Sequence, residues 1–254
     1  MHYKIFLLRF LKFFRKSILE NENGGIDMVT YYTALGRMIT REENGARIPI
    51  IIIDDTEYQM TVDELIVWGS LHWCFMDKEA VEKEYSRRKA KNRIFNDVSF
   101  EQTLSRLVFR GLVVSGTDYL AADALYGLIG TLKIRPVKFS LFDKLQSIAY
   151  LYFEKGLTLK ECYNAYFGTE TTPNEKNVLR LSKRVGISAS EIIKCAENNI
   201  TDIKSEDDIM DKLYNDDETT YETIAVHSRF SELKTDIVKA VANLYLKKKI
   251  VFEN

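Results

Sequence analysis

The sequence predicts a mainly α-helical protein with a small β component, divided into two parts rather than folded as one large domain. The chain has 254 residues but only 3 prolines and 12 glycines, and this scarcity favours helices joined by short connections. Hydrophobic residues make up 46% of the chain and charged residues 29%, which is close to the globular average. These proportions exclude a chain that is disordered throughout.

The composition also bears on the functional class. Lys and Arg total 36 against 37 Asp and Glu, so the net charge of −1 neither favours nor excludes a nucleic-acid partner. The cysteines, Cys74, Cys162 and Cys195, form no Cys-x-x-Cys pair, and only three histidines accompany them. We therefore expect reduced thiols in the cytoplasm, without a metal site or a disulfide framework. The sequence has no glycine-rich phosphate loop and no hydrolase signature, so we expect no cofactor, no catalytic residues and no enzymatic activity.

The N-terminal segment differs from the rest of the chain. Residues 1–19 carry five cations and no acid, and cations interrupt the apolar run, so the segment does not meet the requirements for a transmembrane helix. We expect no membrane partner, although attachment of a basic amphipathic helix to a membrane surface is an alternative. Gly24-Gly25 stands shortly before Met28, where glycine codons would supply a ribosome-binding sequence. We therefore expect translation to start at Met28, which makes residues 1–27 a leader outside the native protein.

Residues 28–60 are expected to form a helix and a β-hairpin. The helix ends at Gly45 and is predicted by apolar residues at helical spacing, namely Tyr31, Leu35, Met38 and Ile39. The β-branched run Ile48–Ile53 predicts a strand, Asp54-Asp55 predicts a turn, and residues 56–61 predict the returning strand. This N-terminal hairpin is expected to dock on the next domain or to form a dimer interface.

Residues 61–138 predict three consecutive helices followed by a strand. Each helix begins at a capping residue, and in two of them a Glu or Gln three positions later completes a capping box. The helices are expected at 61–76 (Thr61 with Glu64), after Asp77, and from Ser99 (with Gln102) to Gly111. Downstream we expect a strand at Leu112–Val114, a tight turn at Ser115-Gly116, a helix at 119–130 and extended chain at 132–138.

This order of elements, and the stretch Thr103–Gly116 in particular, resembles the winged helix-turn-helix domain of bacterial transcriptional regulators. The resemblance implies that the helix over 99–110 is the recognition helix, which enters the major groove of double-stranded DNA. It also implies a wing at Ser115–Asp118, which is shorter than is usual in that family. The implied partner is double-stranded DNA, and the protein is expected to bind two half-sites as a homodimer.

The predicted recognition helix has two faces. The face expected to be buried consists of Phe100, Leu104, Leu107 and Val108, and the face expected to read bases consists of Gln102, Thr103, Arg106 and Arg110. Gln pairs with adenine and Arg with guanine, and each such contact contributes about 1–3 kcal/mol of discrimination. Just upstream, a basic run is expected to contact phosphates: Arg87, Arg88, Lys89, Lys91 and Arg93. The alternative for this run is a solvated helix end whose cations interact with the helix dipole.

Residues 139–254 are expected to form a helical domain for oligomerisation or sensing. Elements are expected at Tyr150–Lys155, from Thr158 (capped with Glu161), at Pro173–Val185, from Ser188 (capped with Glu191), at 231–246 and, as a strand, at Lys247–Phe252. Leu181–Lys194 resembles a second helix-turn-helix, but its outer face is expected to expose Glu191, Lys194 and Glu197. Because the acidic stretch Glu197–Glu222 follows, we expect a packing unit here rather than a second DNA contact.

The expected architecture is therefore an N-terminal β-hairpin (28–60), a winged helix unit (61–138) and a C-terminal helical domain (139–254). The expected function is that of a cytoplasmic, double-stranded DNA-binding transcriptional regulator. The alternative is a protein-interaction scaffold of a mobile-element, replication or partition complex, whose protein partner would bind the C-terminal helical domain. Salt dependence separates the two functions, because phosphate contacts lose affinity steeply as the salt concentration rises.

Overall fold

The computed structural model describes residues 28–43, 45–137, 171–216 and 218–254, which fold mainly into α-helices with small antiparallel sheets. The predicted fold class is confirmed in these general terms. The helices are α2 (Val62–Leu71), α3 (Lys78–Lys91), α4 (Phe100–Phe109), α5 (Ala121–Ile129), α8 (Pro173–Leu181), α9 (Ala189–Glu197), α10 (Glu206–Leu213), α11 (Tyr221–Ser228) and α12 (Lys234–Leu246). The strands are β1 (Val29–Ala34), β2 (Arg37–Glu43), β3 (Ala46–Ile53), β4 (Thr56–Gln59), β5 (Val113–Asp118), β6 (Lys133–Pro136), β7 (Ile187–Ser188) and β8 (Ile250–Glu253). None of the helices within these ranges has the length and apolar character needed to cross a bilayer.

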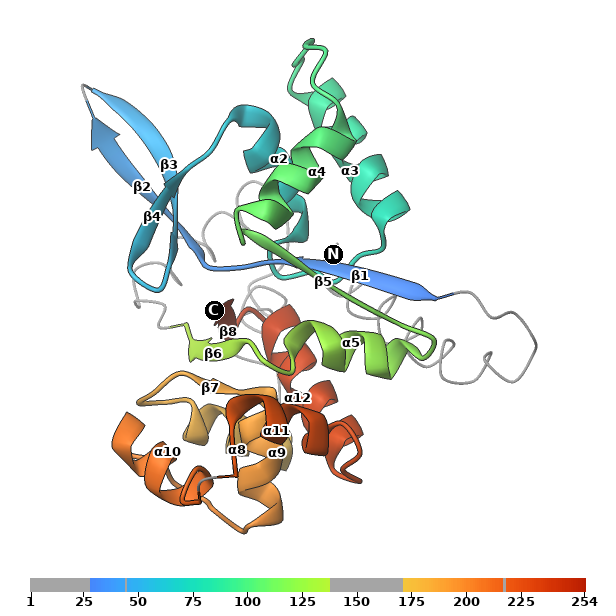
Figure 1. Cartoon of the computed structure of the whole chain (residues 1–254). Helices are drawn as coiled ribbons and strands as arrows, with labels where there is room; N and C mark the ends of the chain where they lie inside the picture. The colour runs from blue at the N-terminus through green and yellow to red at the C-terminus, as the bar shows by residue number, and fades with distance from the viewer. Residues whose placement is uncertain (1–27, 44, 138–170, 217) are drawn as a thin grey trace, which may run out of the picture.

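The strand pair β1–β5 crosses the middle of the molecule and separates two groups of helices (Figure 1). α2, α3 and α4 lie on one side of the pair, whereas α5 and the helices from α8 to α12 lie on the other. β2, β3 and β4 form a three-stranded sheet that projects beside the first group. A continuous cluster of buried apolar residues runs through both groups, so the two groups share one core.

The segment predicted as a helix ending at Gly45 forms β1 and β2 instead, so that prediction is wrong. β1 has the sequence VTYYTA, which is rich in β-branched and aromatic residues that favour extended backbone. Gly36 joins the two strands at a φ of +78°, and a Cβ there would lie 2.3 Å from the Ile52 carbonyl oxygen. Gly45 lies in the turn between β2 and β3 at a φ of +76°, where it reverses the direction of the chain rather than ending a helix.

The predicted hairpin is confirmed, and β2 adds a third strand to it. β3 pairs antiparallel with β2 on one side and with β4 on the other. Asp54 and Asp55 form the turn between β3 and β4, with positive φ angles of 45° and 63°. Asp tolerates this left-handed region better than most residues, which explains why the pair marks the turn.

β5 runs through the tight turn predicted at Ser115-Gly116 and through the wing predicted at Ser115–Asp118, so both of these residue ranges form a strand instead. β1 pairs antiparallel with β5 along its whole length. Gly116 lies within this ladder because α5 packs closely on it, and a Cβ there would lie 2.3 Å from the Ala124 carbonyl oxygen. The partner strand of β5 thus comes from the N-terminal part of the chain, and β5 leads directly into α5.

The starts of α2 and α3 lie where the capping residues predict them. Thr61 and Glu64 form the capping box of α2, and Asp77 caps α3. α2 ends at Leu71, earlier than predicted, because the backbone becomes extended at His72.

α4 begins after Ser99 as predicted, but the predicted capping box with Gln102 is wrong. The Ser99 side chain makes no capping hydrogen bond, and the Thr103 hydroxyl donates to the Ser99 carbonyl oxygen at 2.9 Å. Gly111 ends the helix at a φ of +68°, which confirms the predicted stop.

β6, β7 and β8 form a further antiparallel sheet in the order β7-β6-β8. β6 precedes the domain boundary predicted between residues 138 and 139, whereas β7 and β8 follow it, so this sheet crosses the boundary. The Ser188–Glu191 capping box of α9 is confirmed, and α8 ends at Leu181, before the predicted Val185. β8 is the strand predicted at the end of the chain.

Some predictions concern residues that the structure does not describe. They are the leader over 1–27 and the helices at Tyr150–Lys155 and from Thr158.

Tyr245 of α12 connects the two groups of helices. Its buried hydroxyl accepts a hydrogen bond from the Trp73 backbone N–H and donates one to the Ala34 carbonyl oxygen, both at 3.0 Å. Trp68 is buried beside this junction and donates through Nε1 to the Leu35 carbonyl oxygen. These hydrogen bonds hold β1 between α2 and α12.

Candidate nucleic-acid interface

α4, the predicted recognition helix, buries one face. Phe100, Leu104 and Leu107 are buried as predicted. Thr103, predicted to face outward, is only 2% exposed, because it shares the helical stripe formed by these three residues. Val108, predicted to be buried, is 39% exposed. The buried stripe is therefore rotated slightly from the one that the sequence predicts, and Thr103 lies where it cannot contact a base.

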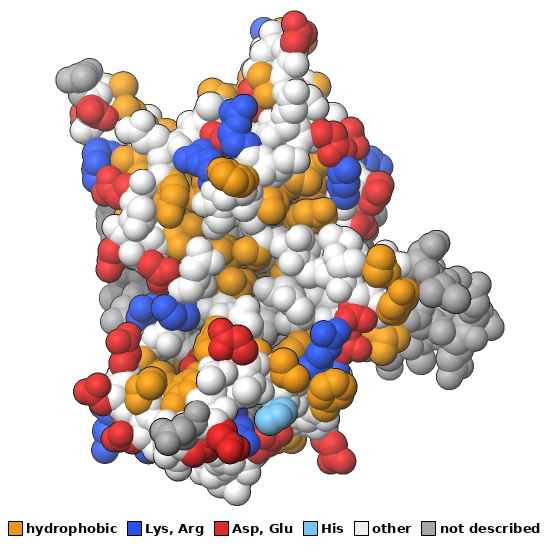
Figure 2. Space-filling view, viewed as in Figure 1, with side chains coloured by type: hydrophobic (Ala, Val, Ile, Leu, Met, Phe, Trp, Pro, Cys, Tyr) orange, Lys and Arg blue, Asp and Glu red, His pale blue; other side chains and the backbone are white. Residues whose placement is uncertain are grey.

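The free face of α4 carries polar, cationic and apolar side chains together. It consists of Glu101, Gln102, Ser105, Arg106, Val108 and Phe109. α4 lies at the front of the molecule with no other element drawn over it (Figure 1), and Lys or Arg side chains lie beside hydrophobic ones over this region (Figure 2). Phe109, which is 92% exposed, is not among the residues that the sequence predicts for this face. Its helical phase, three residues after Arg106 and seven after Gln102, is the signal that identifies it.

Arg106 and Arg110 both lie near Glu64 of α2. Arg110 Nη1 lies 3.0 Å from Glu64 Oε1, and Arg110 Nη2 donates to the Gln59 carbonyl oxygen at 2.7 Å. Arg106 lies 3.9 Å from the same carboxylate oxygen, and its side chain is 54% exposed. Burial opposes ionisation of the Glu64 carboxyl, but hydrogen bonds from Thr61 and Arg110 outweigh burial and lower its pKa. Arg110 therefore makes its contacts inside the protein, whereas Arg106 extends over the surface.

Lys89 of the basic run also has partners inside the protein. Its side chain is 15% exposed, and its Nζ lies 3.4 Å from Asp63 Oδ1 and 2.5 Å from Asn96 Oδ1. Asp63 is buried and accepts a further hydrogen bond from the Tyr85 hydroxyl at 2.6 Å. Burial opposes ionisation of Asp63. Hydrogen bonds from Tyr85, Asn96 and Lys89 outweigh this effect and lower the pKa of the Asp63 carboxyl. Lys89 thus stabilises a buried carboxylate rather than pointing to a phosphate.

Arg87 and Arg88 of the basic run both contact Glu84 on the same helix. Arg87 donates to both oxygens of Glu84, and Arg88 Nε donates to Glu84 Oε1 at 2.7 Å. The hydrogen bond from Arg87 has the largest effect on Glu84, and together with that from Arg88 it lowers the pKa of the carboxyl to about 2. The Arg88 guanidinium lies beside Gly69, so it faces the α2 side of α3.

Lys91 and Arg93 are the remaining cations of the run. Both are exposed at the C-terminal end of α3, and neither forms an ion pair or a side-chain hydrogen bond with another described residue. Four of the nine predicted residues therefore lie on accessible surface without a side-chain hydrogen bond to another described residue, namely Lys91, Arg93, Gln102 and Arg106. Of these, Arg106 has a carboxylate nearby, the Glu64 oxygen at 3.9 Å.

The second helix-turn-helix-like segment has no comparable free face. Glu191, predicted to be exposed on α9, is buried and accepts a hydrogen bond from the Tyr214 hydroxyl at 2.7 Å. That prediction is wrong because the chain after α9 folds back over this helix and brings Tyr214 onto it. Most of α9 is buried, including Ile192, Ile193 and Cys195.

The described residues contain no group of three or more His, Cys, Asp or Glu side chains placed to hold a metal ion. The geometry instead presents one exposed helix face with cations nearby. No protein-family model, curated protein or solved structure matches this chain.

Proposed function

We propose that this protein binds double-stranded DNA and acts as a transcriptional regulator, with α4 lying in the major groove. The observation that carries the proposal is the free face of α4, which presents Gln102 and Arg106 opposite a fully buried stripe. A helix must be anchored on one side and open on the other to enter the groove. Gln102 offers both a donor and an acceptor to adenine, and Arg106 offers paired donors to guanine.

In this proposal the phosphate contacts come from Lys91 and Arg93. Both lie at the end of α3 that leads into α4, so they would lie beside the groove that α4 enters. Lys89 and Arg110 hold the scaffold instead, because each neutralises a buried carboxylate of α2. The regulator would act as a homodimer in the cytoplasm, with one α4 for each half-site.

Fluorescence anisotropy of a labelled random-sequence duplex tests the proposal. The full chain is titrated at low and at moderate salt, and compared with a variant carrying Lys91→Glu, Arg93→Glu and Arg106→Glu. We expect binding that weakens steeply with salt and is lost in this variant. The matched control is Lys239→Glu, which reverses an exposed cation on α12. Absence of binding by the unaltered chain at low salt, or equal loss in the control, would overturn the proposal.

A second candidate function is docking of a protein partner on the same face of α4. The observation that favours it is Phe109, whose ring is almost fully exposed beside the exposed Val108. A packed apolar interface depends little on salt, whereas DNA binding depends on it strongly. Phe109→Ser should leave the salt dependence of DNA binding intact if α4 reads DNA. If the same face is a protein-docking site, that variant should instead lose a salt-insensitive interaction.

A further inference from the structure

A cavity of about 930 Å³ lies between α2, α3 and the turn that joins α12 to β8. Its walls are mostly apolar, with Met38, Met76 and Leu246 among the lining residues. Both tryptophans of the chain, Trp68 and Trp73, also line it. A largely apolar cavity with a few polar groups directed into it is the usual form of a small-molecule site.

One wall of the cavity is a stack of three aromatic rings. The His72 ring lies between the two tryptophans, with its centroid 4.2 Å from that of Trp68 and 3.8 Å from that of Trp73. The His72 Nε2 is buried and has no hydrogen-bond partner. Burial, followed by the charge of Lys248, lowers the pKa of His72 to about 3, so its ring is neutral at physiological pH. The stack therefore contributes apolar surface and no charge.

The charged groups at the cavity give it an excess of positive charge. Lys248 Nζ lies 4.9 Å from the centroid of the Trp73 ring and forms no ion pair with a carboxylate of the described chain. Arg87 and Arg88 lie at the same cavity and share the single carboxylate of Glu84. Three cations thus face one acid. Burial lowers the pKa of Lys248, which is the effect expected of an ammonium group that is surrounded by protein without a counter-ion.

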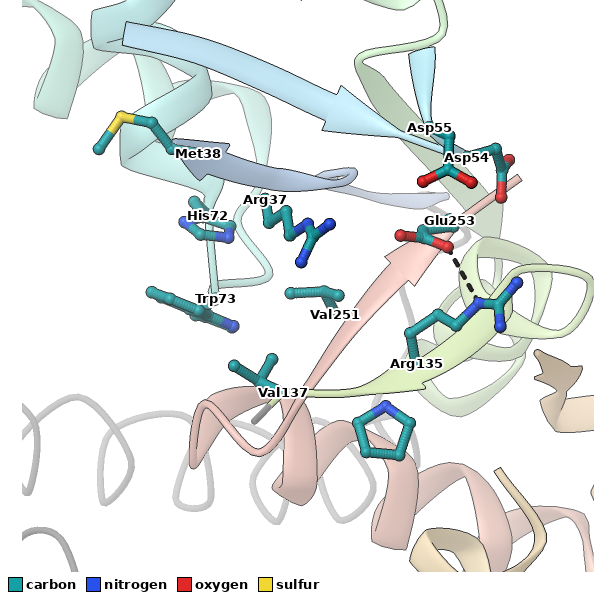
Figure 3. Close-up of a pocket in the computed structure, with 11 residues that line it drawn as sticks. Arg37, Met38, Asp54, Asp55, His72, Trp73, Arg135, Val137, Val251 and Glu253 are labelled. Carbon is teal, nitrogen blue, oxygen red and sulfur yellow. Dashed lines mark hydrogen bonds and ion pairs between the residues drawn. The ribbon is translucent and has the colours of Figure 1, made fainter. Parts of the chain in front are cut away.

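A second cavity, of about 680 Å³, adjoins the first at Met38, His72 and Trp73. Figure 3 shows its charged residues, in which the Arg135–Glu253 ion pair joins β6 to β8 near Asp54 and Asp55. These residues and Arg37 give this cavity one more acid than cations. Of these two adjoining cavities, the first therefore carries the excess of positive charge.

We propose that the cavity between α2, α3 and the α12–β8 turn binds a small organic anion with an apolar body. Lys248 and Arg88 would hold the anionic group, and the apolar body would lie against Met76 and Leu246. A carboxylate or a sulfonate attached to an aromatic or aliphatic body has this chemistry. The inference goes beyond DNA binding and does not depend on it, because no residue of the free face of α4 lines the cavity.

The test uses 8-anilinonaphthalene-1-sulfonate as an anionic probe and 1-anilinonaphthalene as its neutral counterpart. Because both tryptophans line the cavity, excitation of tryptophan reports binding there through energy transfer to the probe. We expect the unaltered full chain to bind the anionic probe more tightly than the neutral one. Lys248→Gln should weaken binding of the anionic probe by about tenfold, which corresponds to one charge-assisted contact. Binding of the neutral probe should stay the same.

The matched control is Lys239→Gln, which removes an exposed cation from α12 away from the cavity. It should leave the affinity of both probes unchanged. Arg88→Gln provides a second variant if Lys248→Gln unfolds the protein, and circular dichroism verifies the fold of each. Equal binding of the two probes, or equal effects of Lys248→Gln and Lys239→Gln, would overturn the proposal. DNA binding measured separately distinguishes its failure from that of the proposed function.

Discussion

Arg110 Nη1 of α4 lies 3.0 Å from Oε1 of Glu64 in α2, whose side chain is only 2% exposed. The preceding residue of α2, Asp63, is also buried and lies 3.4 Å from Lys89 Nζ of α3. The two adjacent acids in the first turn of α2 therefore each hold one neighbouring helix: Asp63 contacts α3 and Glu64 contacts the end of α4. Two cations that the sequence analysis assigns to DNA hold these helices in place.

We predict that Arg110→Ala destabilises the protein by about 3 kcal/mol, because it removes the closer of the two cations beside the buried Glu64 carboxylate and the one that is hydrogen-bonded to it. Arg106→Ala is the matched comparison on the same helix. Since Arg106 is more than half-exposed, its removal should change the free energy of unfolding by less than about 0.5 kcal/mol. Urea denaturation followed by circular dichroism measures both changes. Equal stability of the two variants would show that the Arg110–Glu64 contact does not hold α4.

A second prediction concerns Lys89, which we expect to behave as a structural residue. Lys89→Met should destabilise the protein by about 2 kcal/mol, because Asp63 keeps two hydrogen bonds but loses its cation. Lys91→Met, two positions later and exposed, should leave stability within about 0.5 kcal/mol of the unaltered protein. The same variants titrated with duplex DNA should show the opposite order of effects on affinity. If the Lys89→Met variant is as stable as the unaltered protein but binds DNA more weakly, Lys89 contacts DNA and the structural role is wrong.

The elements that the sequence predicts well are those encoded by neighbouring residues. Capping boxes join residues three positions apart, and the Asp54-Asp55 turn depends on two adjacent residues. β1 is predicted as part of a helix for two reasons. Its partner strand, β5, is distant in the sequence, and the residues of β1 also fit a helical spacing over a short window. Gly116 reads as a turn residue locally, although its lack of a side chain serves the packing of α5 on β5.

In the candidate site, too, the features set by neighbouring residues are predicted and those set by distant residues are not. Helical spacing alone predicts that Leu104 and Leu107 are buried and that Gln102 and Arg106 are exposed. The contact of Arg110 with Glu64 joins residues 46 positions apart, so no local pattern reveals that this cation already has a partner. The cavity beside Trp73 is hidden for the same reason, since its walls come from segments widely separated along the chain.

Two glycines near one another test the placement of β5 beneath α5. Gly116→Ala should destabilise the protein by about 2–3 kcal/mol, because the new Cβ would lie 2.3 Å from the Ala124 carbonyl oxygen and force the helix away. Gly127→Ala, on the open side of α5, meets nothing within 4 Å and should stabilise the helix by about 0.5–1 kcal/mol. Thermal and urea unfolding measure both. If residues 115–116 formed a solvent-exposed turn, the two substitutions would not differ in this way.

His72 should make the stability of the protein depend on pH in a range where few other groups titrate. Burial lowers its pKa from 6.5 to about 3, so between these values the unfolded chain binds one more proton than the folded protein. His72 has no effect on stability well above pH 6.5, where it is neutral in both states. Below pH 6.5 the free energy of unfolding falls as the pH is lowered, with a slope approaching about 1.4 kcal/mol per pH unit. Urea denaturation at closely spaced pH values from about 7 to 5.5 measures this slope, since carboxylates with pKa values near 4 contribute little there.

The control variant is His72→Phe, which keeps a flat ring between the two tryptophans and removes the titrating group. The stability of this variant should be nearly constant over the same pH range. Equal slopes for the two proteins would mean that the imidazole accepts a proton in the folded state, and that it is not held neutral in the stack.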